Sequence, residues 1–311
     1  MATAFFTDAA MRDHVVPDGH VERPARWDAV TDALSATQFE DLVRKEASKA
    51  DWEVVEAVHD ADFVDELRGM SPTDGLVQID PDTYMGPASL DAALYAAGAA
   101  AAAVDAVVSG EAANAFCATR PPGHHAERRR AMGFGLFNTV AIGAHHARNA
   151  YGAQRVAVVD FDVHHGNGTQ DIFWDDPDAF YASTHEHPQY PGTGMAEEIG
   201  AHNNVVNVPL PSGTGSQAFR AALEERVLPT LRAFRPDFVF ISAGFDAHAA
   251  DPLGGFQLVE DDFAWATTEI AAAADDLCNG RVVSVLEGGY DLAALGKSAA
   301  AHVSALMRAA L

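Results

Sequence analysis

The chain has 311 residues, of which 48% are hydrophobic and 9% aromatic, so it can bury a large core and is not a disordered chain. Its 45 acidic and 20 basic residues give a net charge of −25, which argues against direct binding to nucleic-acid phosphates. Two cysteines are too few for a disulfide framework or a thiolate zinc site. An acidic surface can confer solubility alone, but so large an excess with only three lysines favours an intracellular environment of high salt.

No signal peptide is expected, because the residues after Met1 carry no basic charge and Asp8 interrupts the apolar start. The most apolar stretch, residues 92–104, lies between Asp91 and Asp105 and is too short to span a bilayer. We therefore expect a cytoplasmic protein that contacts no membrane.

Short apolar runs alternate along the chain with longer stretches of helical spacing. In chain order, the expected helices and strands are helix 90–108, strand 115–118, helix 138–150, strands 156–161, 179–183 and 205–208, helix 218–233, strand 238–242, helix 261–277, strand 282–286 and helix 292–310. Strands that alternate with helices predict an α/β fold with a mainly parallel sheet covered on both faces. No linker divides the chain, so we expect one domain over residues 1–311.

Polar motifs follow four of the expected strands. They lie at residues 120–125 (RPPGHH), 160–166 (DFDVHHG), 244–246 (GFD) and 287–290 (EGGY). In open parallel sheets the ligand crevice lies outside the carboxyl ends of the strands. We therefore expect histidine, carboxylate and phenol side chains to meet at one edge of the sheet.

Asp162 and His164 are two residues apart, so in an extended chain they point to the same side. A carboxylate and an imidazole joined by a second carboxylate make a divalent metal site with room for water. We choose Asp246 as that third ligand. The competing interpretation is a buried, hydrogen-bonded cluster without a metal.

His124 and His125 follow a stiff Pro-Pro-Gly turn that can hold both rings. A histidine pair on its own is usually solvated, but beside a metal one ring can take a proton from water while the other stabilises charge. Tyr290 follows Gly288 and Gly289, whose backbone turns freely, and its phenol can donate to an oxyanion. The alternative interpretation is that the Tyr290 side chain only packs against its neighbours.

Together these motifs resemble the histone deacetylase family, most closely its class II branch and prokaryotic relatives. The resemblance rests on residues 19–26 (GHVERPAR), 120–125, 132–138 (MGFGLFN), 160–170 (DFDVHHGNGTQ), 191–194 (PGTG), 244–246 and 287–290. It runs from about Gly19 to the final helix. It implies an arginase/deacetylase-like fold of three α/β/α layers with an eight-stranded parallel sheet.

The resemblance also implies a catalytic zinc ion and a role for each matching residue. Asp162, His164 and Asp246 would hold the zinc. His125 would act first as general base and then as general acid, with His124 as its electrostatic partner. Asp160 would orient His124, and the Tyr290 hydroxyl would hydrogen-bond with the substrate carbonyl and with the oxyanion. Residues implied to contact the substrate are Gly133, Phe134, Tyr190, Leu253 and Gly288.

A structural potassium ion is implied near a second group of residues, mostly through backbone carbonyls. These are Asp160, Asp162, His164, Ser183 and Thr184, with a second potassium site near Phe173.

Three positions depart from the common pattern of the family. Tyr190 replaces the usual phenylalanine, Gly135 replaces a cysteine, and Asn167 stands where class I enzymes have an aspartate. An amide favours the imidazolium less than a carboxylate does, so we expect His125 to be neutral more readily.

The resulting hypothesis is zinc-dependent hydrolysis of N-ε-acyl-lysine in a protein or peptide. The first alternative is hydrolysis of small acetylated amines such as acetylpolyamines, against which the apolar Leu253 at the rim argues. A two-manganese ureohydrolase would need further bridging carboxylates. A non-catalytic acyl-lysine binder is disfavoured because the base, the ligands and Tyr290 are all present. The sequence leaves the substrate protein, the acyl length and the oligomeric state open.

Overall fold

The computed structural model describes residues 1–311 and contains an eight-stranded sheet in the order β2-β1-β5-β10-β9-β6-β7-β8. Every neighbouring pair in it is parallel. The strands are β1 (Thr3–Thr7), β2 (Val43–Glu46), β5 (Asn114–Cys117), β6 (Val156–Asp160), β7 (Ala179–Glu186), β8 (Val205–Leu210), β9 (Phe238–Ala243) and β10 (Val282–Leu286). The predicted fold class is confirmed.

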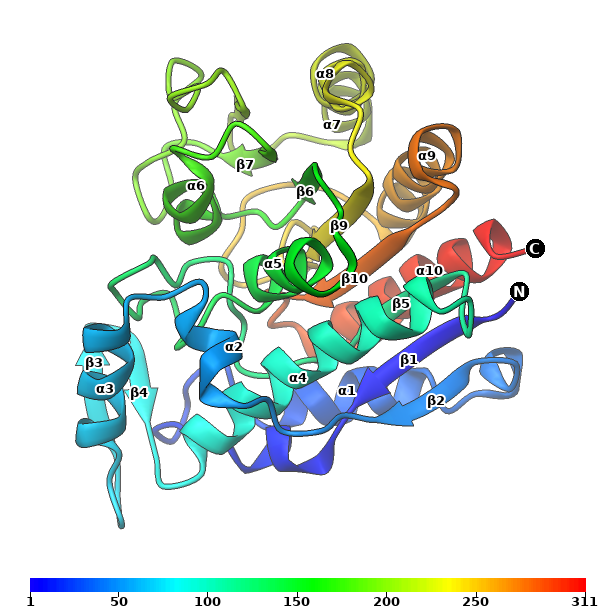
Figure 1. Cartoon of the computed structure of the whole chain (residues 1–311). Coiled ribbons are helices and arrows are strands. Elements are labelled where there is room, and N and C mark those ends of the chain that lie inside the picture. Colours follow the sequence, from blue (N-terminus) through cyan, green and yellow to red (C-terminus); the bar gives the residue numbers. More distant parts are fainter.

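Helices cover both faces of this sheet (Figure 1). One face carries α2 (Trp52–Glu56), α3 (Ala61–Met70), α4 (Ser89–Val108), α5 (Thr139–Tyr151) and α6 (Asn167–Phe173), and the other carries α1 (Ala25–Ala33), α7 (Ser216–Ala222), α8 (Leu228–Phe234), α9 (Glu260–Cys278) and α10 (Leu292–Ala309). Each face has its own apolar core, one of 43 and one of 37 buried residues. The three-layer arrangement thus follows from central strands that are apolar on both sides.

The helix α4 spans Ser89–Val108, so it is longer than the apolar run of residues 92–104. With 20 residues the whole helix is long and apolar enough to cross a membrane by length and composition, whereas the expectation of too short a stretch concerned residues 92–104 alone. In this structure 67% of its most apolar window is buried against the rest of the protein. Its alanines and Gly98 permit that packing, because a Cβ on Gly98 would lie 1.7 Å from the Ser48 carbonyl oxygen.

Several elements differ from the sequence-based expectation. The strands β1 and β2 were not predicted. The strand β2 (VRKE) is a short edge strand, and its charged residues lack the apolar pattern by which a strand is predicted. The expected helix 218–233 is divided by a π-helical turn at Leu223–Val227. An antiparallel hairpin of β3 (Val77–Asp80) and β4 (Thr83–Met85) stands apart from the main sheet (Figure 1).

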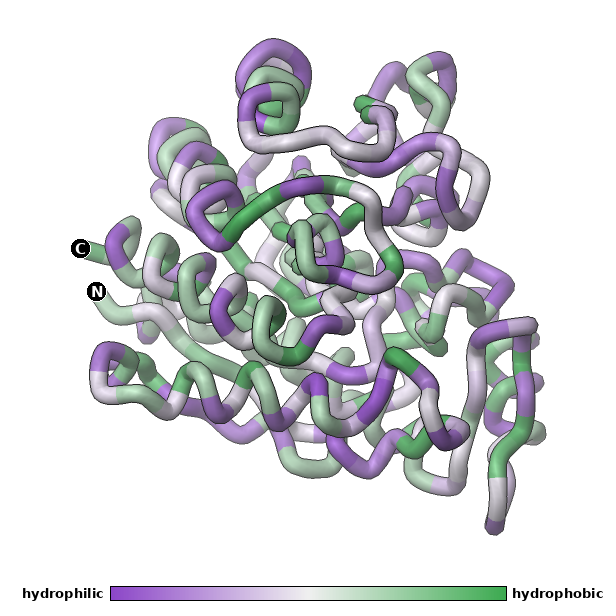
Figure 2. Tube along the Cα trace, turned by 180° about the vertical axis from the view of Figure 1, so that it is seen from behind, coloured by the Kyte–Doolittle hydropathy of each residue, from purple (hydrophilic) through white to green (hydrophobic).

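The four strands that precede the polar motifs, β5, β10, β9 and β6, are consecutive neighbours in the sheet. Their carboxyl ends therefore bring the motifs to one edge, as predicted. The chain termini lie side by side at another part of the molecule, where the Met1 amino group donates to the Ala310 carbonyl at 2.8 Å (Figures 1 and 2). In Figure 2 the outer helices alternate between apolar and polar turns, as expected of helices with one buried face.

Candidate active site

Asp162 and His164 follow β6, and Asp246 follows the neighbouring strand β9. His164 Nδ1 lies 3.1 Å from Asp162 Oδ1 and 3.1 Å from Asp246 Oδ2. All three side chains are buried, and one ligand atom from each lies within 4.8 Å of the others. The tertiary structure thus brings together the three residues chosen from the sequence.

The surroundings of this cluster fit a divalent metal. The Gly288 N–H donates to Asp162 Oδ2 at 2.8 Å and the Val163 N–H donates to Asp246 Oδ1 at 2.9 Å, so both carboxylates are held by backbone. A Cβ on Gly288 would lie 2.0 Å from Asp246 Oδ2, so only glycine fits against the cluster there. Two carboxylates and one imidazole form a three-ligand set of the kind found in catalytic zinc sites.

Electrostatics at the cluster favour positive charge. Burial disfavours the imidazolium of His164, but the carboxylates of Asp246 and Asp162 outweigh it and raise the pKa of His164 to about 10. Two buried carboxylates beside one ring therefore attract a cation, and a divalent metal with neutral imidazole is the arrangement such sites use.

His124 and His125 follow β5 and differ in their electrostatic surroundings. His124 Nδ1 lies 2.9 Å from Asp160 Oδ2. Burial opposes the charge of His124, yet the carboxylates of Asp160, Asp162 and Glu287 raise its pKa well above the usual value. Burial, together with His124 and His164, lowers the pKa of His125 well below its usual value. The surroundings of the two adjacent rings thus favour the protonated form of His124 and the neutral form of His125.

The partner of His125 is Asn167, whose Oδ1 lies 2.8 Å from His125 Nδ1. Asn167 is the first residue of α6, which packs beside the loop that carries both histidines. The Gly168 and Thr169 N–H groups donate to the His124 carbonyl at 3.0 and 3.1 Å, which fixes α6 against that loop. The expected pairing of His125 with an amide is therefore present.

Tyr290 is buried and is held from two sides. The Arg26 guanidinium lies 4.9 Å from its ring centre, and Arg26 Nε donates to the Gly289 carbonyl at 2.6 Å. Asp251 Oδ2 accepts the Tyr290 N–H at 2.7 Å. Burial raises the pKa of Tyr290 well above its usual value, so its hydroxyl keeps the proton that it would donate.

A cavity of about 220 Å³ lies beside His125, His164 and Tyr290. Gly133, Phe134, Tyr190 and Leu253 line it, as expected for substrate contacts, together with His125, His164 and Tyr290. Gly288 is not part of this lining and instead supports Asp162. Asp82, from the β3–β4 hairpin, and Gln189 also line the cavity; the sequence analysis missed both because they belong to none of the motifs.

Glu287 is another polar residue to which the sequence analysis assigned no role. Its Oε2 accepts the Gly123 and His124 N–H groups at 2.7 and 3.0 Å, so it fixes the histidine loop to the end of β10. Burial raises the pKa of Glu287 to about 7, although His124 acts in the opposite direction. Its position in the EGGY motif was the available signal.

Ser183 and Thr184, expected near a potassium ion, lie on β7 beside the end of β6, where Ser183 pairs with Asp160. Both are buried, and Thr184 Oγ1 has no hydrogen-bond partner. The potassium site itself stays a prediction.

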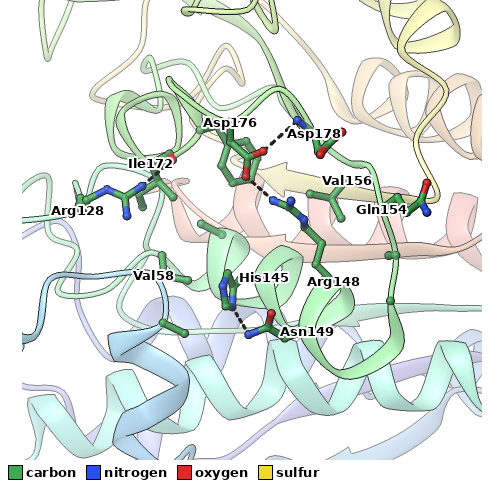
Figure 3. A pocket seen from close by; sticks show the side chains of 15 residues that line it. Val58, Arg128, His145, Arg148, Asn149, Gln154, Val156, Ile172, Asp176 and Asp178 are labelled. Carbon is green, nitrogen blue, oxygen red and sulfur yellow. Dashed lines mark hydrogen bonds and ion pairs between the residues drawn. The ribbon is translucent and has the colours of Figure 1, made fainter.

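A second cavity, of about 780 Å³, lies away from these residues, between α5, the end of α2 and the segment that follows α6 (Figure 3). Arg148, at its centre, forms an ion pair with Asp176, and His145 hydrogen-bonds with Asn149 (Figure 3). Arg148 and Asp176 therefore neutralise each other, Arg128 donates to the Ile172 carbonyl at 2.9 Å, and the lining includes neither the metal cluster nor His124 or His125. The smaller cavity is the candidate active site.

Comparisons with known proteins agree with this geometry. A histone deacetylase domain profile matches residues 20–306. The chain is 39% identical over 279 residues to the histone deacetylase-like amidohydrolase of Pseudomonas aeruginosa, covering 88% of this chain and 73% of that protein. It is 37% identical over 310 residues to chloroplastic histone deacetylase 14 of Arabidopsis thaliana, covering 93% and 73%.

Among solved structures, the crystal structure of the HDA15 HD domain superposes with a TM-score of 0.93 at 38% identity, covering 99% of this chain and 88% of that one. The match includes the eight-stranded parallel sheet and therefore the edge at which the metal cluster and both histidines lie. The chain belongs to the histone deacetylase family of hydrolases.

Proposed function

We propose that the protein is a zinc-dependent deacylase that removes acetyl or related acyl groups from the ε-amine of lysine. The observation that carries this proposal is that His125, His164 and Tyr290 all line one cavity of about 220 Å³. A base, a metal ligand and a hydroxyl donor that converge on one narrow space suit the hydrolysis of an amide at the end of a slender chain. We assign the whole chain, residues 1–311, to one catalytic domain.

Asp162, His164 and Asp246 would hold the zinc ion, which supplies Lewis acidity toward the acyl carbonyl and toward water. His125, kept neutral, accepts the proton of the attacking water and then delivers it to the departing amine. His124, kept positive beside Asp160, stabilises the negative charge that develops. The Tyr290 hydroxyl donates to the oxyanion of the tetrahedral intermediate.

The cavity wall favours an acyl-lysine chain. Phe134 and Tyr190 offer aromatic surface to four methylene groups, and the apolar Leu253 stands at the rim. Acetylpolyamine hydrolysis is the second candidate, and one observation favours it: Asp82 brings a carboxylate to the same cavity, where a distant ammonium group could pair with it. We place the reaction in the cytoplasm, with acetylated proteins or small acetylated amines as substrates.

The test is a parallel assay of zinc-loaded protein on acetyl-lysine peptides, longer acyl-lysine peptides and acetylated polyamines at several salt concentrations. We expect the highest kcat/KM on an acyl-lysine peptide. A higher kcat/KM on acetylpolyamines would select the second candidate. Binding of acyl-lysine without turnover of any substrate, at full zinc content, would identify a non-catalytic binder instead.

A further inference from the structure

Glu127 lies two residues after His125 and contacts the amide that pairs with that histidine. Asn167 Nδ2 donates to Glu127 Oε1 at 2.7 Å. The same nitrogen lies 3.4 Å from the His125 carbonyl oxygen and 3.3 Å from Met132 Sδ. All three neighbours accept hydrogen bonds, so this end of the amide must be its NH₂ group.

This orientation decides the state of the imidazole. With its NH₂ turned to Glu127, Asn167 presents Oδ1 to His125 Nδ1 at 2.8 Å. An amide oxygen only accepts, so Nδ1 of the neutral ring must carry the hydrogen. The lone pair is then on Nε2, the only ring nitrogen left to accept a proton from water.

We propose that Glu127 is a positioning residue that sets the tautomer of His125 through the orientation of the Asn167 amide. The inference rests on the proposed role of His125 as the base. Glu127 touches no reacting atom; it acts by leaving Asn167 one favourable orientation. An acceptor at position 127 therefore matters, whereas a negative charge there is not required.

The backbone of Glu127 is itself fixed. Its N–H donates to the Arg130 carbonyl at 2.9 Å, and its carbonyl accepts from His59 Nδ1 at 3.0 Å. His59 Nε2 accepts the Asn138 N–H at 2.9 Å, so Nδ1 is the donor. Burial lowers the pKa of His59 to about 4, which keeps this ring neutral near pH 7. A buried histidine thus holds the residue that orients the amide.

The test compares three substitutions that differ in hydrogen-bonding character. Glu127→Gln keeps an acceptor oxygen, and we expect kcat within about twofold of the wild type. Glu127→Ala leaves only the two weaker acceptors, so an intermediate loss is expected. Glu127→Lys puts a donor beside the amide and favours the flipped orientation, which places the hydrogen on Nε2; we expect kcat to fall by about 10²-fold, as for loss of a general base. Arg129→Ala, with a side chain 69% exposed on the same loop, is the matched control.

A compensating substitution separates this effect from misfolding. A carboxylate at position 167 accepts from both a lysine at position 127 and His125 Nδ1. The kcat of the double variant Glu127→Lys with Asn167→Asp should therefore lie within about tenfold of the kcat of Asn167→Asp alone. It should be far higher than the kcat of the single variant Glu127→Lys. Zinc content and melting temperature are measured for every variant.

The direct measurement is the ¹⁵N chemical shift of the His125 ring nitrogens, with and without zinc. We expect a protonated Nδ1 in wild type and Glu127→Gln, and a protonated Nε2 in Glu127→Lys. An unchanged tautomer in Glu127→Lys, a Glu127→Gln variant as impaired as Glu127→Ala, or the absence of rescue would overturn the inference. Full activity of His125→Ala would instead overturn the proposed base, and the ring shifts would still report on Glu127.

Discussion

The backbone N–H of Tyr290 donates to Asp251 Oδ2 at 2.7 Å, across 39 positions of sequence. The same oxygen lies 3.3 Å from the Asp291 N–H, and Oδ1 accepts the Leu253 N–H at 2.9 Å. Asp251 is only 8% exposed. One buried carboxylate therefore joins the rim loop after β9 to the loop that carries the proposed oxyanion donor.

Asp251→Asn is expected to lower kcat by about tenfold with little change in KM, because the NH₂ group must face a backbone N–H in either amide orientation, that of Leu253 or those of Tyr290 and Asp291, and the loop that carries Tyr290 is then held less firmly. The same substitution in a Tyr290→Phe background should cost less than about twofold if Asp251 acts through the hydroxyl. Asp291→Asn, which preserves the cap of α10, is the control. Equal losses in both backgrounds would show that Asp251 does not act through Tyr290.

The proposed metal ligands are tested by Asp162→Ala, His164→Ala and Asp246→Ala. Each should abolish zinc binding and activity while leaving the fold intact, since two remaining protein ligands are too few for a catalytic zinc site. Metal analysis of the purified variants, with circular dichroism as the check on folding, decides the point. Full zinc occupancy in Asp246→Ala would remove that residue from the site.

Tyr290→Phe removes one hydroxyl and leaves the ring under Arg26. We expect zinc content and KM to be nearly unchanged and kcat to fall by about 10²–10³, the cost of losing one oxyanion donor. Steady-state kinetics at saturating zinc measure this. Wild-type kcat in the variant would mean that Tyr290 only packs.

Burial of His302 predicts how the free energy of unfolding changes with pH. Its Nδ1 hydrogen-bonds with Thr267 Oγ1 at 2.6 Å and its Nε2 with Ser284 Oγ at 2.8 Å, and burial lowers its pKa to about 3. The unfolded chain, with a histidine pKa of about 6.5, then binds one more proton between these values, so stability falls as the pH drops below about 6.5, by about 1.4 kcal/mol for each pH unit.

Removing this group should flatten the profile. In His302→Gln the free energy of unfolding should lose about 1.4 kcal/mol per pH unit less between pH 6 and pH 4.5 than in the wild type. Urea unfolding in the presence of a chelator measures the slope without a contribution from zinc release. His202→Gln, at an exposed position, should keep the wild-type slope. Equal slopes for His302→Gln and wild type would contradict the assignment.

The net charge of −25 predicts a dependence on salt. Like charges on one compact domain repel, and the screening length falls from about 10 Å at 0.1 M salt to about 3 Å at 1 M. We therefore expect the melting temperature and the activity to rise from dilute buffer to molar potassium chloride, with zinc saturating.

Sodium chloride is the matched comparison for this experiment. Potassium should have the advantage if a monovalent ion binds near Asp160 and Ser183. A melting temperature that stays flat or falls in both salts would contradict the high-salt interpretation, and the acidic surface would then serve solubility alone. An identical rise in both would retain the high-salt interpretation and count against the potassium preference.

Local sequence determined the central strands and the chemistry at their ends. Apolar runs at β6, β9 and β10 predict buried parallel strands, and the residues that follow each strand emerge at its carboxyl end whatever the rest of the chain does. For this reason Asp162, His164, Asp246 and the paired histidines could be chosen before the structure was known. The edge strand β2 escaped prediction because its charged residues carry no apolar pattern.

Tertiary structure alone decided which distant groups touch. Nothing in the spacing shows that Asp82 reaches the active-site cavity from the β3–β4 hairpin, or that Asp251 holds the backbone of Tyr290. The orientation of the Asn167 amide likewise depends on Glu127, 40 positions earlier. Hydrogen bonds between loops depend on where separate strands end in space. The hydrophobic pattern of the sequence predicts the strands, but it does not predict which loop residues hydrogen-bond with one another.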